Sequence, residues 1–256
     1  MQDLYEDLDL DLPDLRRLTL RVGAAAAGVP NSRGDLLVVF ETEGVEPPVL
    51  EADFPVSAAM LLPTGESANL IGESALVESC DGREWRVSAG SFFQVNPGAA
   101  EHLPSLVSEF AALTGTESVL ELYSGVGLLT RRLSTGRSVV GIEVNPDAVA
   151  DAAVNLEETE NVELYQGTVA EVLLALSDQA FDVVVLDPPR AGVEPGVTDL
   201  LLEIRAARIV YVSCDPATFA RDARLLARGG YRLKTVQPVD MFPQTYHIET
   251  VSLLEL

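Results

Sequence analysis

The chain has 256 residues, of which 47% are hydrophobic, and this composition indicates a globular protein of one or two domains. Its two cysteines cannot build a disulfide framework or supply the ligands of a structural zinc ion or an iron–sulfur cluster, so we expect no metal and no cluster. The formal net charge of −23 repels nucleic acid at long range, so an RNA substrate would require a local basic groove with arginines gathered at its mouth.

No apolar run in the sequence approaches the ~18 residues that a membrane span needs. The acidic start, MQDLYEDLDLDLPDL, has no apolar core of the kind found in signal peptides. We therefore expect a cytoplasmic protein that makes no contact with a membrane. No pattern in the sequence predicts a protein partner.

The first 90 residues predict a small α+β domain. Its strand candidates are short apolar segments separated by stretches rich in turn-forming residues, such as residues 24–34. We expect strands at residues 15–23, 35–44, 68–74 and 84–93. We place the boundary of this domain at residue 90, so that residues 91–256 form a second domain.

The second domain begins with a predicted helix. Asn96 is suited to cap this helix, Pro97 fits its first turn, and Gly115 ends it. Apolar residues form one face of the helix, at Leu103, Leu106, Val107, Phe110 and Leu113.

Strands and helices then alternate as far as residue 230. We expect strands at 118–125, 137–144, 161–167, 181–189 and 207–214, and helices at 127–134, 145–158, 168–177, 196–206 and 215–230. Such alternation indicates a parallel sheet that helices cover on both faces. The last two strands, 231–240 and 247–256, have no helix between them, so we expect an antiparallel pair at the sheet edge. A parallel sheet that ends in this way is typical of the Rossmann-like fold of class I S-adenosylmethionine-dependent methyltransferases.

The first strand-to-helix turn carries the pattern of a cofactor site. Gly125 and Gly127 allow the backbone to approach a ligand closely, and Glu143 ends the next strand, where a carboxylate accepts hydrogen bonds from ribose hydroxyls. A dinucleotide fingerprint would have a third glycine where Thr130 stands, so the pattern favours S-adenosylmethionine over NAD. An ordinary tight turn and a solvated strand end are the structural alternatives.

Two polar residues follow the last two parallel strands. Ligands of such sheets bind beyond the carboxyl ends of the strands, so Asp187 and Cys214 should lie near the cofactor. Asp-Pro-Pro is followed by Arg190, whereas enzymes that methylate amino groups of bases typically have an aromatic residue there. The helix that starts after Cys214 lowers a thiol pKa by less than about one unit, and Asp215 acts against this effect. A small buried apolar residue is the alternative interpretation of Cys214.

Glu249 interrupts the apolar pattern of the last strand. It lies between Ile248 and Thr250, and His247 shares its strand face. A glutamate is unusual there if the strand is internal, whereas on an edge strand it would be solvated. For His247 we expect a structural hydrogen-bonding role.

Six motifs of the second domain occur in a fixed order. They are SFFQVN (91–96), ELYSGVGLLT (121–130), GIEVNPDAV (141–149), LDPPRAG (186–192), VSCDPATFARD (212–222) and VDMFPQTYHIETV (239–251). In this order and spacing they resemble the RNA 5-methyluridine methyltransferase family. The resemblance implies an enzyme that transfers a methyl group from S-adenosylmethionine to carbon 5 of a uridine in structured RNA, either tRNA or rRNA.

The resemblance also assigns roles to matched positions. It implies that Cys214 is the nucleophile and that Glu249 is the base that removes the carbon-5 proton. The thiolate would add to carbon 6 of a uracil that has been flipped out of its stack, and this addition makes carbon 5 nucleophilic. With Gly125 and Gly127, the cofactor contacts fall on Gln94, Tyr123, Glu143, Asp187 and a position near Thr168.

The chain departs from the family pattern at several points. Asp215 replaces the usual asparagine, and Leu128 stands where the family often has a polar residue. Cys80 matches no family ligand, and the chain has neither the N-terminal RNA-binding barrel nor the iron–sulfur cysteines of some members. Two other interpretations remain open, a methyltransferase acting on another base position through Asp187, and a non-catalytic module that binds cofactor or RNA.

Overall fold

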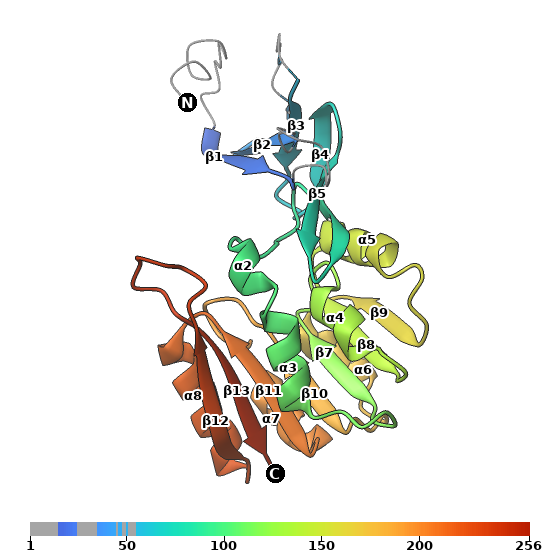
Figure 1. The fold of residues 1–256 in the computed structure, drawn as a ribbon, viewed down its shortest axis with the longest axis vertical. Helices are drawn as coiled ribbons and strands as arrows, with labels where there is room; N and C mark the ends of the chain where they lie inside the picture. The colour runs from blue at the N-terminus through green and yellow to red at the C-terminus, as the bar shows by residue number, and fades with distance from the viewer. Residues whose placement is uncertain (1–14, 25–34, 45, 48–49, 51–54) are drawn as a thin grey trace.

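A seven-stranded sheet forms the lower half of the computed structural model as drawn in Figure 1, and the structure describes residues 15–24, 35–44, 46–47, 50 and 55–256. In spatial order its strands are β12 (Arg232–Val239), β13 (Glu249–Glu255), β11 (Arg208–Ser213), β10 (Val183–Leu186), β7 (Val119–Leu122), β8 (Val139–Glu143) and β9 (Val162–Gln166). Strands β7 to β11 are parallel, whereas β13 runs antiparallel between β11 and β12. The predicted parallel sheet with a terminal antiparallel pair is confirmed, and β13 is an internal strand.

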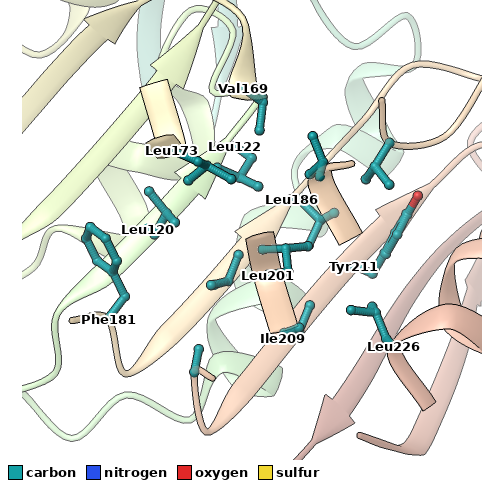
Figure 2. Close-up of a cluster of buried hydrophobic side chains, with 14 of the residues drawn as sticks. Leu120, Leu122, Val169, Leu173, Phe181, Leu186, Leu201, Ile209, Tyr211 and Leu226 are labelled. Carbon is teal, nitrogen blue, oxygen red and sulfur yellow. The ribbon is translucent and has the colours of Figure 1, made fainter. Parts of the chain in front are cut away.

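Helices cover both faces of this sheet, as the alternation of elements predicts. On one face lie α3 (Leu103–Ala111) and α4 (Leu128–Leu133); on the other lie α6 (Val169–Ala175), α7 (Val197–Ile204) and α8 (Pro216–Arg228). Strand β10 shows the consequence, because Val183 and Val185 join one apolar cluster while Val184 and Leu186 join the other. Figure 2 shows the second cluster, in which Leu186 and Tyr211 of the sheet meet helix side chains such as Leu201.

The helix predicted between Asn96 and Gly115 is divided in the structure. The Asn96 side chain caps α2 (Pro97–Ala100), and α3 starts afresh at Leu103. The reason is Pro104, which has no backbone N–H to donate to the carbonyl of Ala100 and so cannot continue a single helix. The other predicted Asn-Pro start is confirmed, since Asn145 caps α5 (Pro146–Asn155).

The N-terminal region contains a four-stranded sheet and a separate hairpin. The sheet consists of β1 (Leu15–Val22), β2 (Leu36–Thr42), β3 (Ser57–Leu61) and β4 (Ser67–Ile71), and the hairpin of β5 (Ala75–Cys80) and β6 (Arg83–Ser88). Sequence analysis did not anticipate β3 and β5. Residues 1–14 and the predicted turn at 25–34 lie outside the described residues, and the domain boundary at residue 90 stays a prediction. Within the part of the chain that the structure describes, no helix is long and apolar enough to cross a membrane.

Cys80 packs as a hydrophobic residue inside the hairpin region. Its side chain is fully buried beside Trp85, whose indole Nε1 donates to the Cys80 carbonyl at 2.8 Å. Burial, with help from Glu101 and Asp81, raises the pKa of the Cys80 thiol to about 11, so this cysteine stays protonated at neutral pH.

A buried carboxylate, Asp151 of α5, fastens the hairpin to the second domain. It accepts hydrogen bonds from the backbone N–H of Ser88 (2.6 Å) and from the hydroxyls of Ser88 (2.7 Å) and Ser91 (2.6 Å). The guanidinium of Arg86 pairs with it at 2.9 Å, and one helical turn later Asn155 exchanges two hydrogen bonds with the Arg86 backbone. These contacts fix where the chain enters the loop that carries Gln94.

We predict that Asp151→Ala strongly destabilises the protein. The substitution leaves the buried donors of Ser88 and Ser91 without their acceptor and the Arg86 guanidinium without its partner, which should cost about 3 kcal/mol. Chemical denaturation should show a lower midpoint than for Asp178→Asn, a change at an exposed turn position. Equal midpoints for the two variants would contradict a clamping role for Asp151.

Candidate active site

The residues expected at the strand ends gather along one edge of the large sheet. Glu143 ends β8, and Tyr123, Asp187 and Cys214 directly follow β7, β10 and β11. Because these strands are parallel neighbours, their carboxyl ends meet at the same edge, which lies on the side of α2 and the hairpin in Figure 1. This edge is where open α/β sheets bind their ligands.

The two glycines of the first turn are required for different reasons. Both have positive φ angles, 54° at Gly125 and 90° at Gly127. A Cβ on Gly127 would lie 2.8 Å from Cδ1 of Leu156, so this glycine allows the turn to pack against the end of α5. A Cβ on Gly125 would meet no atom within 4 Å, so this glycine borders open space that a ligand can occupy.

Glu143 and Tyr123 shape the same turn. One Glu143 carboxylate oxygen accepts from the backbone N–H of Gly125 at 2.9 Å, and the other accepts from Asn145 at 2.8 Å. The remaining lone pairs of that carboxylate can accept from ribose hydroxyls. Tyr123 has a φ of 63°, a strained value for a bulky residue, and its hydroxyl has no hydrogen-bond partner among the described residues.

Two expected cofactor contacts lie in a capping motif and a loop. Thr168 caps α6, and its hydroxyl donates to the Glu171 carboxylate at 2.7 Å and accepts from the Glu171 backbone at 3.3 Å. Its local role is therefore that of a helix N-cap, with one lone pair left over. Gln94 is half-buried in the loop before α2. This loop is tied to the segment before β13, since the Asn96 side chain donates to the Met241 carbonyl at 3.2 Å.

Leu128 and Asp215, which depart from the family pattern, both have structural roles. Leu128 packs in an apolar cluster with Trp85 and Val126. The Asp215 carboxylate caps α8 by accepting from the backbone N–H groups of Ala217 (2.8 Å) and Thr218 (3.0 Å). The hydrogen bond from the Thr218 backbone is the main reason that the pKa of Asp215 is lowered, so this residue is a charged helix cap.

Strand register brings Cys214 and Glu249 together. The last paired residues of β11 and β13 are Ser213 and Thr250, and the Thr250 hydroxyl donates to the Ser213 carbonyl at 3.3 Å. One step further along the antiparallel pair, Cys214 stands opposite Glu249. Thus the end of one strand and the start of its neighbour present a thiol and a carboxyl group at the same place.

Burial raises the pKa values of Cys214, Glu249 and the nearby Asp187. Burial raises the pKa of Glu249 to about 8, with a smaller contribution from Asp187, and burial raises the pKa of Asp187 to about 7. Glu249 is only 5% exposed, and its Oε1 has no hydrogen-bond partner among the residues described. Burial, then Glu249 and Asp187, also raise the pKa of the Cys214 thiol.

Arg190 is the cation of the site, a role that sequence analysis did not assign to it. Its guanidinium lowers the pKa values of both Cys214 and Glu249, and Nη2 lies 3.4 Å from Nε2 of His247. The sequence feature that could have identified Arg190 as a site residue is its position directly after Asp-Pro-Pro, at a strand end. The strand expected to begin at His247 begins at Glu249 instead, so His247 lies in the loop two residues before β13 and does not share a strand face with Glu249.

Glu121 is a second residue that sequence analysis did not assign to the site. It is 2% exposed on β7, and burial, with Asp187 and Glu143, raises its pKa to about 8, while Thr130 opposes this shift. A single acidic residue in the apolar segment VLEL was the signal for it. Glu121 is therefore a third acidic residue, with Asp187 and Glu143, near the turn that contains Gly125.

Known proteins resemble this chain over most of its length. The model of the family described as tRNA (Uracil-5-)-methyltransferase matches residues 75–256. An uncharacterized RNA methyltransferase of Bacteroides thetaiotaomicron is 45% identical over 195 residues, which are 72% of this chain and 42% of that protein. One from Streptomyces avermitilis is 39% identical over 227 residues, 86% of this chain and 52% of the relative. The chain thus spans about half the length of these curated relatives.

A solved structure supports the same grouping. The crystal structure of Pyrococcus abyssi tRNA (uracil-54, C5)-methyltransferase in complex with S-adenosyl-L-homocysteine has a TM-score of 0.71 and 30% sequence identity to this chain. The match covers 94% of this chain and 60% of that one. Since the family model covers well over half of the sequence, the chain belongs to the tRNA (uracil-5-)-methyltransferase family.

Proposed function

We propose that this protein transfers a methyl group from S-adenosylmethionine to carbon 5 of a uridine in RNA. The observation that carries the proposal is that Cys214 and Glu249 directly flank the paired residues Ser213 and Thr250, at the ligand-binding edge of the sheet, where Glu249 acts on the thiol electrostatically. Family membership and the solved relative from Pyrococcus abyssi support the same activity.

Cys214 is the nucleophile in this proposal. Carbon 5 of uracil is a weak nucleophile until a thiolate adds to carbon 6 and places the electron pair of the ring double bond on carbon 5 as an enolate. Arg190 favours the thiolate, because its positive charge opposes the burial that raises the thiol pKa. Asp215 is compatible with this role, since its carboxylate is engaged with the first turn of α8.

Glu249 is the general base. After carbon 5 has gained its methyl group, Glu249 takes the remaining proton from that carbon, the ring double bond forms again and the Cys214 thiolate leaves. The raised pKa of Glu249, about 8, suits a base that must hold a proton near neutral pH.

The strand-end residues suit S-adenosylmethionine. When bound, this cofactor supplies an electrophilic methyl group on a positively charged sulfur. We propose that Glu143 holds its ribose and that Gly125 and Gly127 allow the backbone to lie against it, as the open space at Gly125 permits. Acidic groups around the turn favour a cation. The remaining contacts are assigned to Gln94, Tyr123, Thr168 and Asp187.

We propose that structured RNA, either tRNA or rRNA, reaches the site along a cleft beside the loop that carries Gln94. This cleft of about 430 Å³ lies between the first sheet and the loop, and its lining includes Arg17 and Arg21 of β1, Glu41 of β2, and Phe92 and Val95. Glu41 lies 3.7 Å from Arg17, and the Arg21 guanidinium donates to the carbonyls of Ser88 and Ser91 at 3.0 Å, so the cleft has little free positive charge to offset the net charge of −23.

We predict that the wild-type chain forms a covalent adduct with RNA that contains 5-fluorouridine in the presence of S-adenosylmethionine. The fluorine on carbon 5 cannot be removed as a proton, so the thioether to Cys214 persists and a denaturing gel detects it. Cys214→Ala should abolish the adduct, whereas Cys80→Ala, which removes the other cysteine, should retain it. An adduct that survives Cys214→Ala would exclude Cys214 as the nucleophile.

We predict that Glu249→Gln separates addition from release. Because the base acts only after methyl transfer, the variant should still form the 5-fluorouridine adduct, while turnover on ordinary RNA falls at least about 100-fold. Glu255→Gln, on the same strand, serves as the control and should turn over normally. Wild-type turnover in Glu249→Gln, measured as released 5-methyluridine, would assign the base elsewhere.

We predict that turnover rises with pH between about 6 and 9. Glu249 loses its basic form as pH falls through about 8, and a thiol whose pKa is raised supplies more thiolate as pH rises. Arg190→Gln removes the charge that lowers both pKa values, so the profile should move about one unit toward higher pH. A pH–rate profile that is unchanged in Arg190→Gln would show that Arg190 does not set these pKa values.

A further inference from the structure

The segment between β12 and β13 carries a stack of aromatic rings beside the candidate site. The ring centroids of Tyr246 and His247 are 4.2 Å apart with a 42° interplanar angle, and Phe242 meets His247 edge-on at 5.7 Å. Tyr246 is 92% exposed, the highest value among the large hydrophobic side chains exposed in the described part of the chain. Its ring therefore rests on His247 and leaves most of its surface open to solvent.

A chain of contacts links this exposed ring to the reacting groups. His247 lies 3.4 Å from the Arg190 guanidinium, and Arg190 acts directly on the pKa of Cys214. Glu249 follows His247 by two residues, and Met241, at the other end of the segment, accepts from Asn96. Tyr246 is thus held at the mouth of the site between two anchored points.

An exposed aromatic ring in this place fits one kind of partner. Unpaired nucleotides stack on aromatic side chains, and such stacking tolerates any base because each base has a π face. A uridine that leaves its stack to reach Cys214 exposes the faces of its neighbours in the strand. We propose that Tyr246 stacks on the nucleotide next to the target uridine and holds the RNA strand in its opened form.

The inference rests on the proposed function, whose substrate contacts it extends. It also bears on the net charge of −23, which weakens binding through phosphate contacts. Stacking involves no counterions, so its contribution does not fall as salt rises. An acidic protein therefore gains more from such a contact than a basic one.

The test compares three substitutions at one position in the full chain. Tyr246→Ala removes the ring, Tyr246→Leu keeps an apolar side chain without a π face, and Tyr246→Phe keeps the ring without the hydroxyl. Affinity is measured by fluorescence anisotropy with a fluorescein-labelled tRNA transcript and with labelled ribosomal RNA, at two salt concentrations.

We expect Tyr246→Ala and Tyr246→Leu to weaken binding about tenfold, by the same factor at both salt concentrations, and Tyr246→Phe to bind like the wild type. KM for RNA should rise by the same factor, while kcat at saturating RNA and the affinity for S-adenosylmethionine should stay unchanged. Val154→Ala, an exposed truncation on α5, serves as the control for loss of apolar surface.

Other results would overturn the inference. Unchanged affinity in Tyr246→Ala, normal affinity in Tyr246→Leu, or a wild type that binds neither RNA would each do so. The 5-fluorouridine adduct tests the proposed function separately. If the adduct forms but substitutions at Tyr246 do not change RNA affinity, the proposed function stands and the stacking contact is wrong. If those substitutions weaken RNA binding but no adduct forms, the stacking contact stands and the proposed function is wrong.

Discussion

The position of one buried carboxylate determines how the two parts of this chain meet. Asp151 accepts three hydrogen bonds and an ion pair from residues 86–91, and it does so from α5, the helix that follows Glu143. The loop with Gln94 begins where these contacts end, and the turn at Gly127 packs against Leu156 just after α5. Helix α5 thus positions two groups of proposed cofactor contacts, the loop with Gln94 through Asp151 and the turn with Gly125 and Gly127 through Leu156.

Acidity is the second constraint on the site. Glu121, Asp187 and Glu249 all have raised pKa values, while Arg190 acts against this trend on Cys214 and Glu249. A protonated carboxyl group costs less to bury than a carboxylate, which explains how these acids share one edge of the sheet. A positively charged ligand bound beside these groups would lower their pKa values and favour the carboxylate forms, as Arg190 already does for Glu249.

The sequence was most informative where local patterns and tertiary structure agree. Asn145 and Pro146 predict a helix start from the chemistry of the cap alone, and the apolar run at 183–186 predicts a strand buried on both faces. Strand β3 was missed because Ala58 and Ala59 have little strand preference, and pairing with β2 and β4 makes it a strand. The contacts of Arg190 depend on the position of β13, which no local pattern encodes.

The antiparallel course of β13 has a consequence for the order in which the site is completed. β13 leaves the ribosome after β12 but must lie between β12 and β11, so the sheet stays open at that position until the strand inserts. Until then Cys214 has no Glu249 opposite it. A nascent chain can therefore form the parallel strands and their apolar core while it still lacks its proposed catalytic pair, and insertion of this single strand completes the seven-stranded sheet and that pair together.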